Sequence, residues 1–173
     1  MSFLVPQRND ALVIRRAHPD DATAIARVHV QSWREAYAGI IPQDHLDRLS
    51  LPAHERQWRA SLADGGWAFV AEWEQKLVGF GSGGLSRSRR DISGELYVLY
   101  VLRACHQRGI GRALFDACHY ELARRGHRGM IVWVLADNPA RGFYERLGGT
   151  LAGESIVAVG GERLREVAYV WPD

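Results

Sequence analysis

The sequence predicts a single α+β domain over residues 1–173, with helices on both faces of a mixed sheet of about seven strands. Three observations support this α/β/α sandwich-like arrangement. The chain is 47% hydrophobic and 24% charged, which is typical of a globular domain with an ample core. Short β-prone runs come before, between and after stretches with helical periodicity. One strand–helix–strand unit, residues 95–135, predicts a right-handed crossover and therefore one parallel strand pair among hairpins.

The first half of the chain is expected to form a strand, three helices and a hairpin. After a strand at 12–17, the sequence His18-Pro-Asp-Asp begins a helix, which Asp20 or Asp21 can cap. Apolar residues at spacings of three and four continue this helix until Gly39 ends it. The remaining expected elements are helices at 43–49 and 53–62 and strands at 67–73 and 76–82, with a turn at Glu74-Gln75 between the strands.

The second half is expected to contain the crossover and a final hairpin. Residues 95–102 read Glu-Leu-Tyr-Val-Leu-Tyr-Val-Leu, a strongly β-prone run. The helix that follows carries Leu114, Cys118 and Leu122 on one face, and the apolar run 130–135 is typical of a strand buried on both faces. The expected elements are the helices 110–125 and 140–147 and the strands 95–102, 130–135, 150–159 and 164–171, the last two joined at Gly160-Gly161.

A short basic glycine turn joins the strand at 95–102 to the helix that follows. Gly109 and Gly111 allow several backbone N–H groups to point one way at a helix N-terminus, where the helix dipole adds a partial positive charge. Such a nest predicts a bound pyrophosphate, and Arg108 and Arg112 can add charge-assisted hydrogen bonds. The alternative is an ordinary tight turn. The residues of the turn are His106, Gln107, Arg108, Gly109, Ile110, Gly111 and Arg112.

Two common phosphate-binding motifs are absent from this turn. Gly111 is followed by Arg112-Ala113, so no Ser or Thr hydroxyl is placed for a magnesium ion as in the P-loop. Leu114 stands where the dinucleotide-binding fingerprint needs its third glycine. The phosphate-bearing ligand therefore belongs to another class.

A second segment, residues 130–149, identifies that class by resemblance. It contains a buried strand, the break Asn138-Pro139 and the run Phe143-Tyr-Glu-Arg-Leu-Gly-Gly. Together with the glycine turn, it resembles the GCN5-related N-acetyltransferase (GNAT) family. That family carries Arg/Gln-x-x-Gly-x-Gly/Ala after its fourth strand, then an Asn and Phe-Tyr-Glu-x-x-Gly after its fifth. His106 departs from the pattern, which usually has Arg or Gln there.

The resemblance implies a fold and a cofactor. The fourth and fifth strands of a GNAT fold separate in a V, and acetyl-CoA lies in the opening as the cosubstrate, without a metal. The matching main-chain groups are those of Leu99, Tyr100 and Val101, which a local bulge would free. The turn His106–Arg112 would hold the pyrophosphate. Asn138 would bind the pantetheine or the main chain, with a plain turn role as its alternative.

The resemblance also implies an N-acetyltransferase that moves an acetyl group to a primary amine by direct attack. Tyr144 matches the family's general acid, and its alternative is a core aromatic residue. Glu95 is the expected general base, acting through a water, and its alternative is a solvent-exposed strand cap. Strand alternation places Glu95, Tyr97, Leu99 and Val101 on one face, so Tyr97 is expected to share the site.

The acceptor is expected to be a small-molecule or peptide amine. The resemblance places its pocket between the first helices and the last hairpin, with Trp33, Tyr37 and Tyr97 as substrate-binding residues and Trp58 as a further candidate wall. Aromatic residues at helical spacing are otherwise core. The basic loop 87–90 weakly indicates an acidic acceptor or the 3′-phosphate of CoA.

Composition limits the partners and the compartment. A net charge of +2 does not indicate nucleic acid, no apolar run approaches 18 residues, and the histidines lack metal-site spacing. We therefore expect no nucleic acid, no membrane and no metal. Two cysteines and no signal-peptide pattern predict a cytoplasmic protein. A homodimer is possible from the resemblance alone.

Two other functions stay open on the sequence. A non-catalytic acyl-CoA-binding regulatory domain on the same fold would keep the nest and lack a working base. An unrelated α/β protein that binds a nucleotide would require the second motif to be a coincidence.

Overall fold

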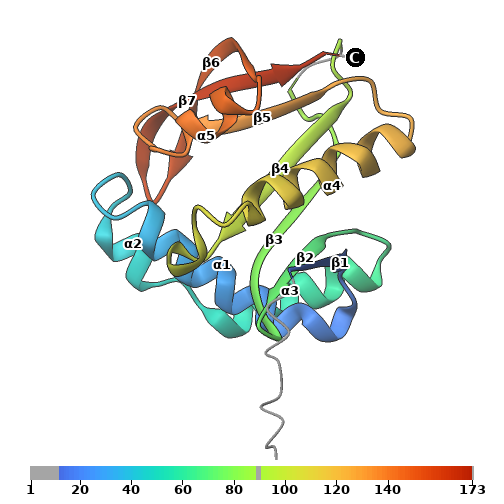
Figure 1. Cartoon of the computed structure of the whole chain (residues 1–173). Helices are drawn as coiled ribbons and strands as arrows, with labels where there is room; N and C mark the ends of the chain where they lie inside the picture. Colours follow the sequence, from blue (N-terminus) through green and yellow to red (C-terminus); the bar gives the residue numbers. More distant parts are fainter. Residues whose placement is uncertain (1–11, 89–90, 173) are drawn as a thin grey trace, which may run out of the picture.

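The computed structural model describes residues 12–88 and 91–172, and in this part of the chain it contains a seven-stranded sheet in the order β1-β2-β3-β4-β5-β7-β6 (Figure 1). The strands are β1 (Val13–Arg16), β2 (Phe69–Trp73), β3 (Lys76–Leu85), β4 (Gly94–Val101), β5 (Met130–Leu135), β6 (Thr150–Val159) and β7 (Glu162–Trp171). The helices are α1 (Ala22–Ala36), α2 (Gln43–Asp47), α3 (Leu51–Ala63), α4 (Ile110–Arg124) and α5 (Arg141–Arg146), with 3-10 turns at Pro19–Asp21 and Arg103–Cys105.

The architecture confirms the predicted α+β class. Only β4 and β5 pair in parallel, and every other neighbouring pair is antiparallel. The strand at 130–135 and the helix start at Ile110 lie where the sequence predicts them. The strand expected at 76–82 continues to Leu85 because its last residues pair with the start of β4. No helix in the described ranges is long and apolar enough to span a membrane.

Helices pack on both faces of the sheet. On one face, Phe115, Cys118 and Leu122 of α4 pack against buried residues of β4 and β5. On the other face, α1 and α3 cover β2 and β3, with Ile25 against Phe80 in the same cluster. Burying each large apolar side chain contributes about 2 kcal/mol. The two clusters therefore hold the middle strands of the sheet between two helical layers.

The parallel strands β4 and β5 stay together for only part of their length. Their pairing comprises Gly94 with Met130, Glu95 with Ile131 and Leu96 with Val132. β4 then continues to Val101 beside β3, while β5 continues to Leu135 beside β7. The two strands lie together at the upper right of Figure 1 and diverge toward the left. The expected V-shaped separation is therefore present, and we call it the β4–β5 gap.

A β-bulge in β4 lies where this separation begins. Val98 pairs with Ser82 and Leu96 pairs with Gly83, so Tyr97 has no partner on β3. The extra residue reverses the alternation of side chains beyond it.

The expectation that Glu95, Tyr97, Leu99 and Val101 share one face is therefore wrong. Arg87 contacts both Glu95 and Tyr97. Leu99 and Val101 instead pack against α4, whereas Tyr100 packs with the α1–α3 cluster.

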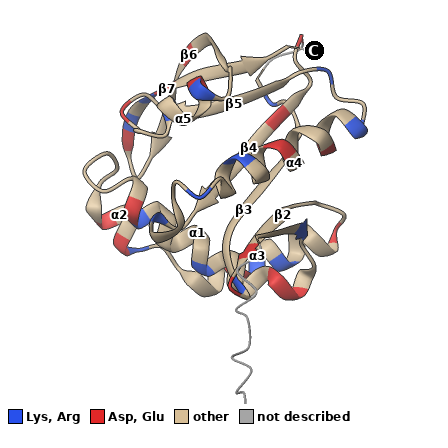
Figure 2. Ribbon diagram, in the orientation of Figure 1, with Lys and Arg blue, Asp and Glu red and all other residues tan. Residues whose placement is uncertain are grey.

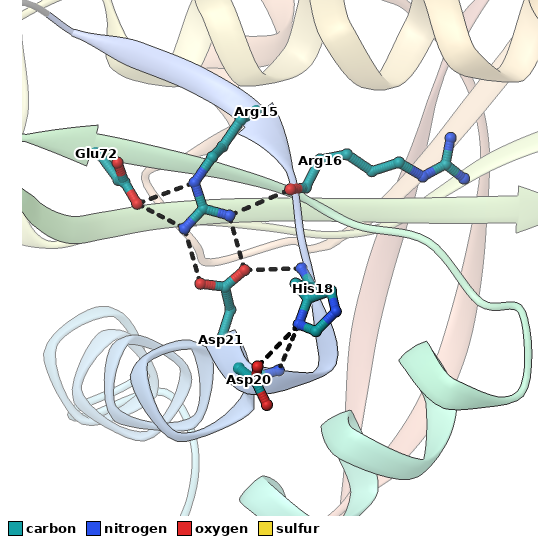
Figure 3. Close-up of polar contacts among 6 residues, drawn as sticks. All are labelled: Arg15, Arg16, His18, Asp20, Asp21 and Glu72. Carbon is teal, nitrogen blue, oxygen red and sulfur yellow. Dashed lines mark hydrogen bonds and ion pairs between the residues drawn. The ribbon is translucent and has the colours of Figure 1, made fainter.

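Arg15 fastens β1 to the start of α1 (Figure 3). Its guanidinium donates to both oxygens of Asp21 at 2.8 Å and to Glu72 of β2 at 3.0 Å from Nε. Asp21 also accepts from the His18 backbone N–H at 2.7 Å, which closes a capping box before α1. The Arg15 guanidinium therefore lowers the pKa of Asp21. Ion pairs therefore link the edge strand β1 to the start of α1, in addition to the covalent connection between them.

Glu121 joins α4 to β1 in a similar way. This carboxylate is buried and accepts hydrogen bonds from Arg124 and Arg125 on its own helix, at 2.8 and 2.7 Å. Arg16 of β1 reaches the same carboxylate at 3.2 Å. The hydrogen bond from Arg124 is the largest cause that lowers the pKa of Glu121, from 4.5 to about 2.

We predict that Glu121→Gln lowers the free energy of unfolding at pH 7 by about 1–3 kcal/mol, because three guanidinium groups lose a buried charged partner. Because the pKa of Glu121 is lower in the folded protein than in the unfolded chain, its ionised carboxylate stabilises the fold above about pH 4.5. This contribution is lost as the pH falls from about 4.5 to about 2. Urea unfolding at pH 7 and pH 3 should show the difference from the wild type shrinking at pH 3.

The control is Asp116→Asn on the same helix. Asp116 is 58% exposed and pairs with Arg112 at 3.5 Å, so its loss should change stability by less than about 0.5 kcal/mol. Equal effects of the two substitutions at pH 7 would contradict a stabilising role for the Glu121 network.

Candidate active site

The basic glycine turn forms a nest of free backbone donors at the start of α4. Gln107 and Gly109 have positive φ angles of 60° and 77°, which turn successive N–H groups toward one side. From Gln107 to Arg112, no backbone N–H bonds to a backbone carbonyl of the described residues, and the first that does is Ala113, to Gly109 at 3.0 Å. Six consecutive donors at a helix N-terminus suit an anion such as a pyrophosphate.

The side chains of the nest are held away from its centre. His106 Nε2 donates to the Val101 carbonyl at 2.9 Å, which ties the ring to the end of β4. Arg108 lies over the Trp73 ring, 5.6 Å from its centroid. Arg112 is 68% exposed and forms an ion pair with Asp116, one turn further along α4. The main chain therefore supplies the inner donors, and the departure at His106 leaves those donors intact.

The main chain of β4 faces the gap beyond its last contact with β5. Leu102 N–H bonds to Val78 of β3 at 2.8 Å, and orientation alternates along an antiparallel ladder. The N–H of Tyr100 is therefore directed at β3, and those of Leu99 and Val101 are directed at the gap. Of the three main-chain contacts expected for the cofactor, Leu99 and Val101 are placed for it. Tyr100 instead sends its side chain toward α1.

α5 packs against both the nest and the gap. A side chain at Gly111 would approach the Phe143 ring at 3.2 Å, so glycine there permits the close contact between α4 and α5. Asn138 is buried, and its Oδ1 accepts from Ala140 N–H at 2.8 Å, the turn role. The structure therefore shows the turn role of Asn138, and its contact with the pantetheine stays a prediction.

Three tyrosines gather at the wide end of the gap. The hydroxyls of Tyr37 and Tyr100 are 3.2 Å apart, and the Trp33 ring lies edge-on to Tyr37 with centroids 5.1 Å apart. Burial raises the pKa of Tyr37 and of Tyr100. Tyr144 is near enough to both phenols for a charge on one to raise the pKa of another. The predicted residues Trp33, Tyr37 and Tyr144 therefore lie in the same region of the molecule.

Tyr144 is also a core residue. It is 6% exposed, and its ring lies 6.3 Å from that of Tyr169 and 6.2 Å from that of Trp171. Burial is the main cause that raises the pKa of its hydroxyl, and the nearby Cys118 adds to it. Its hydroxyl has no hydrogen-bond partner among the described residues. Packing fixes the ring, and the hydroxyl remains available to a ligand.

Glu95 is buried and paired with Arg87. The carboxylate is 3% exposed and accepts from the Arg87 backbone N–H at 2.8 Å and from Arg87 Nε at 3.1 Å. The same guanidinium lies 4.3 Å from the centroid of the Tyr97 ring. The alternative of a solvent-exposed cap at Glu95 is therefore wrong. Figure 2 shows an acidic position near the start of β4, and Glu95 is the acidic residue in the sequence of that strand.

The basic loop differs from the expectation in one respect. Arg87 forms an ion pair with Glu95 and a cation–π contact with Tyr97. These contacts already use its charge, which was expected to bind an acidic acceptor or a CoA phosphate. Arg89 and Arg90 lie outside the described residues. The Arg87–Glu95 pair had no signal in the sequence, because a connection between strands brings the two residues together.

A groove of about 450 Å³ lies between the α1–α2 connection and β7, where the acceptor pocket was expected. Residues 39–43 form one wall, and Glu162 and Leu164 form the other. Leu164 packs against the same hydrophobic cluster as Trp33 and Tyr37, so the groove borders the part of the core that contains these two residues.

Trp58 lies behind the tyrosines, next to His29, whose ring stacks on that of Tyr100 with centroids 5.4 Å apart. It donates to His29 Nδ1 at 3.1 Å within the α1–α3 packing. Burial lowers the pKa of His29 to about 4, so this ring is neutral at pH 7. Its acceptor nitrogen is occupied by Trp58, which leaves His29 a packing residue.

The sheet opens between two parallel strands and offers free main-chain donors along one strand and at the start of the next helix. Residues 64–148 match the acetyltransferase (GNAT) domain. The chain is 38% identical over 164 residues to the uncharacterized N-acetyltransferase YuaI of Bacillus subtilis (strain 168), covering 94% of each chain. The chain therefore belongs to the GNAT family.

Solved structures show the same fold. A GCN5-related N-acetyltransferase from Rhodopseudomonas palustris superposes with a TM-score of 0.74 over 99% of both chains at 22% identity. The yncA protein of Salmonella typhimurium, solved with its cofactor acetyl-CoA, gives a TM-score of 0.69 over 94% of both chains at 21% identity. The family excludes the unrelated nucleotide-binding protein that the sequence left open.

We predict that Gly109→Ala weakens CoA binding about tenfold, because φ at 77° is strained for alanine and relaxation would turn the nest donors away. Gly126→Ala is the matched control. Its φ is 83°, and at both positions a new Cβ meets nothing within 4 Å.

Both substitutions should lower stability by about 1 kcal/mol, and only Gly109→Ala should change CoA affinity. Calorimetric titration with CoA and urea unfolding measure the two effects. Wild-type CoA affinity in Gly109→Ala would contradict the nest as the phosphate site.

Proposed function

We propose that this protein transfers the acetyl group of acetyl-CoA to a primary amine. The observation that carries the proposal is the presence of two groups of free main-chain donors, one on each side of the turn at residues 102–106. The N–H groups of Leu99 and Val101 face the gap, and the nest follows at residues 107–112. An extended arm ending in a pyrophosphate suits this arrangement. The acetyl-CoA in the yncA structure supports this choice of ligand.

The residues present fit acetyl-CoA. The nest would hold the pyrophosphate, and the β4 edge would bind the pantetheine arm as an added strand does. When bound, acetyl-CoA supplies an electrophilic thioester carbon. The gap-facing N–H groups of β4 are the donors in this chain that can polarise a carbonyl at that place.

Tyr144 is proposed as the general acid. In the overall reaction, a C–N bond to the acceptor forms while the C–S bond breaks, and the sulfur takes a proton from the Tyr144 hydroxyl. The raised pKa of Tyr144 keeps this hydroxyl protonated throughout the working pH range. It also makes proton release harder than for a free phenol. The hydroxyl therefore acts as a hydrogen-bond donor that yields its proton only as charge develops on sulfur.

Glu95 is proposed as the general base, through a water. The acceptor must lose a proton to become a neutral nucleophile, and a buried carboxylate on the acceptor face of β4 can receive it. Arg87 orients this carboxylate with two hydrogen bonds to its side-chain oxygens from the guanidinium and one from the backbone. The pair keeps Glu95 in one position and beside Tyr97.

The alternative is a non-catalytic acyl-CoA-binding regulatory domain on the same fold. The open groove beside the cluster of Trp33 and Tyr37 and the buried Glu95 favour the enzyme. Thiol release from acetyl-CoA, assayed across a panel of amines, tests the proposal. Thermal stabilisation by acetyl-CoA and CoA, but not by ATP or NAD, with no release for any amine would favour the regulatory domain.

We predict that Tyr144→Phe lowers kcat by about ten- to a hundredfold with little change in the KM for acetyl-CoA, because only proton donation is lost. Steady-state thiol release measures both constants. Tyr120→Phe is the control, since this tyrosine is 69% exposed on α4. Undiminished turnover in Tyr144→Phe would remove this residue as the acid.

We predict that Glu95→Gln lowers kcat by about a hundredfold at pH 7, because the amide keeps the shape of the carboxylate but accepts no proton. The loss should shrink as the pH approaches about 10, where the free amine is increasingly neutral without a base. A pH profile of both proteins from 7 to 10 measures this rescue. A loss of constant size over that range would place the base elsewhere.

A further inference from the structure

One face of β7 connects the groove to the gap. Side chains alternate along a strand, so Glu162, Leu164 and Glu166 share a face. Glu162 and Leu164 line the groove between the α1–α2 connection and β7. Glu166 is the next residue on that face, toward the interior. A molecule lying along the groove therefore passes these three side chains in order.

Glu166 lies beside the wide end of the gap. It pairs with Leu135, the last residue of β5, at a level where β5 has already separated from β4. Glu95 lies on the same face of the sheet, at the closed end of the gap where β4 and β5 are still paired, since it is in register with Ile131 and Val170. Glu166 lies four residues further along β7 than Val170, toward the wide end of the gap.

The side chain of Glu166 is half-buried, and no described residue donates a hydrogen bond to its carboxylate. Burial and the negative charge of Glu95 raise the pKa of Glu166, and the more distant Arg87 lowers it. Arg87 makes its hydrogen bonds to Glu95 instead. The three groups together carry one net negative charge, which a cation would compensate.

We infer that the acceptor is a linear amine with a second cationic group and that Glu166 binds this second group. The inference rests on the proposed function and names its substrate class. Neighbouring strands lie about 4.8 Å apart, so Glu166 lies one to two strand spacings, about 5–10 Å, from the centre of the gap. A chain of about four carbons between two ammonium groups spans this distance. Glu162, about 13 Å further along β7, suits the next charge of a longer polyamine.

The test compares 1,4-diaminobutane with n-butylamine, which has the same carbon chain and one ammonium group. In the wild type, the diamine should have the lower KM. Glu166→Gln should raise the KM for the diamine about tenfold and change that for butylamine by less than about twofold. The KM for acetyl-CoA should stay the same. Calorimetric titration of each amine into CoA-saturated protein measures the same difference without turnover.

Glu154→Gln is the matched control, because Glu154 lies on the neighbouring strand β6, in register with Val167 and so on the opposite face. It should leave both amines unchanged. Equal effects of Glu166→Gln on the two amines, or no effect on either in titration, would overturn the inference. If neither amine is acetylated but the diamine still binds through Glu166, the proposed transfer to these amines fails and the binding site stands.

Discussion

The early end of the β4–β5 pairing is the constraint on which the rest of the structure depends. Three residue pairs join the strands, and beyond Leu96 and Val132 each strand follows its other neighbour. An unpaired strand edge inside a protein is costly unless another group satisfies its donors and acceptors. The gap therefore suits an extended ligand that can form hydrogen bonds with the free strand edges.

The bulge at Tyr97 converts this opening into a site with two different faces. Before the bulge, Glu95 and Tyr97 both contact Arg87. After it, Leu99 and Val101 face α4 with apolar contacts. Tyr100 faces the α1 side, where its hydroxyl lies 3.2 Å from that of Tyr37. One extra residue thus lets a single strand present polar side chains on one face and apolar side chains on the other, which suits the proposed acceptor and cofactor sites.

Buried charge serves two purposes in this fold. The Glu121 network is fully satisfied by three arginines and joins α4 to the edge strand, which is a stabilising arrangement. Around the gap, the acids are less completely satisfied. Glu95 has one arginine partner, and the pKa of Glu166 is raised by burial and by Glu95. A half-buried carboxylate with a raised pKa beside an opening, as at Glu166, is a candidate for a functional site.

The sequence by itself determined the class of sheet, the parallel crossover and the glycine turn, because periodicity, β-propensity and backbone freedom are local properties. Motif spacing also predicted site roles for Tyr144, Asn138 and the turn 106–112. Only the tertiary structure decided which residues of β4 face the proposed acceptor site, since a bulge depends on the partner strand. The Arg87–Glu95 pair and the position of Glu166 likewise arise from strands that meet only in the folded sheet. Side-chain direction and charge pairing are set by register, and register is a property of the assembled sheet.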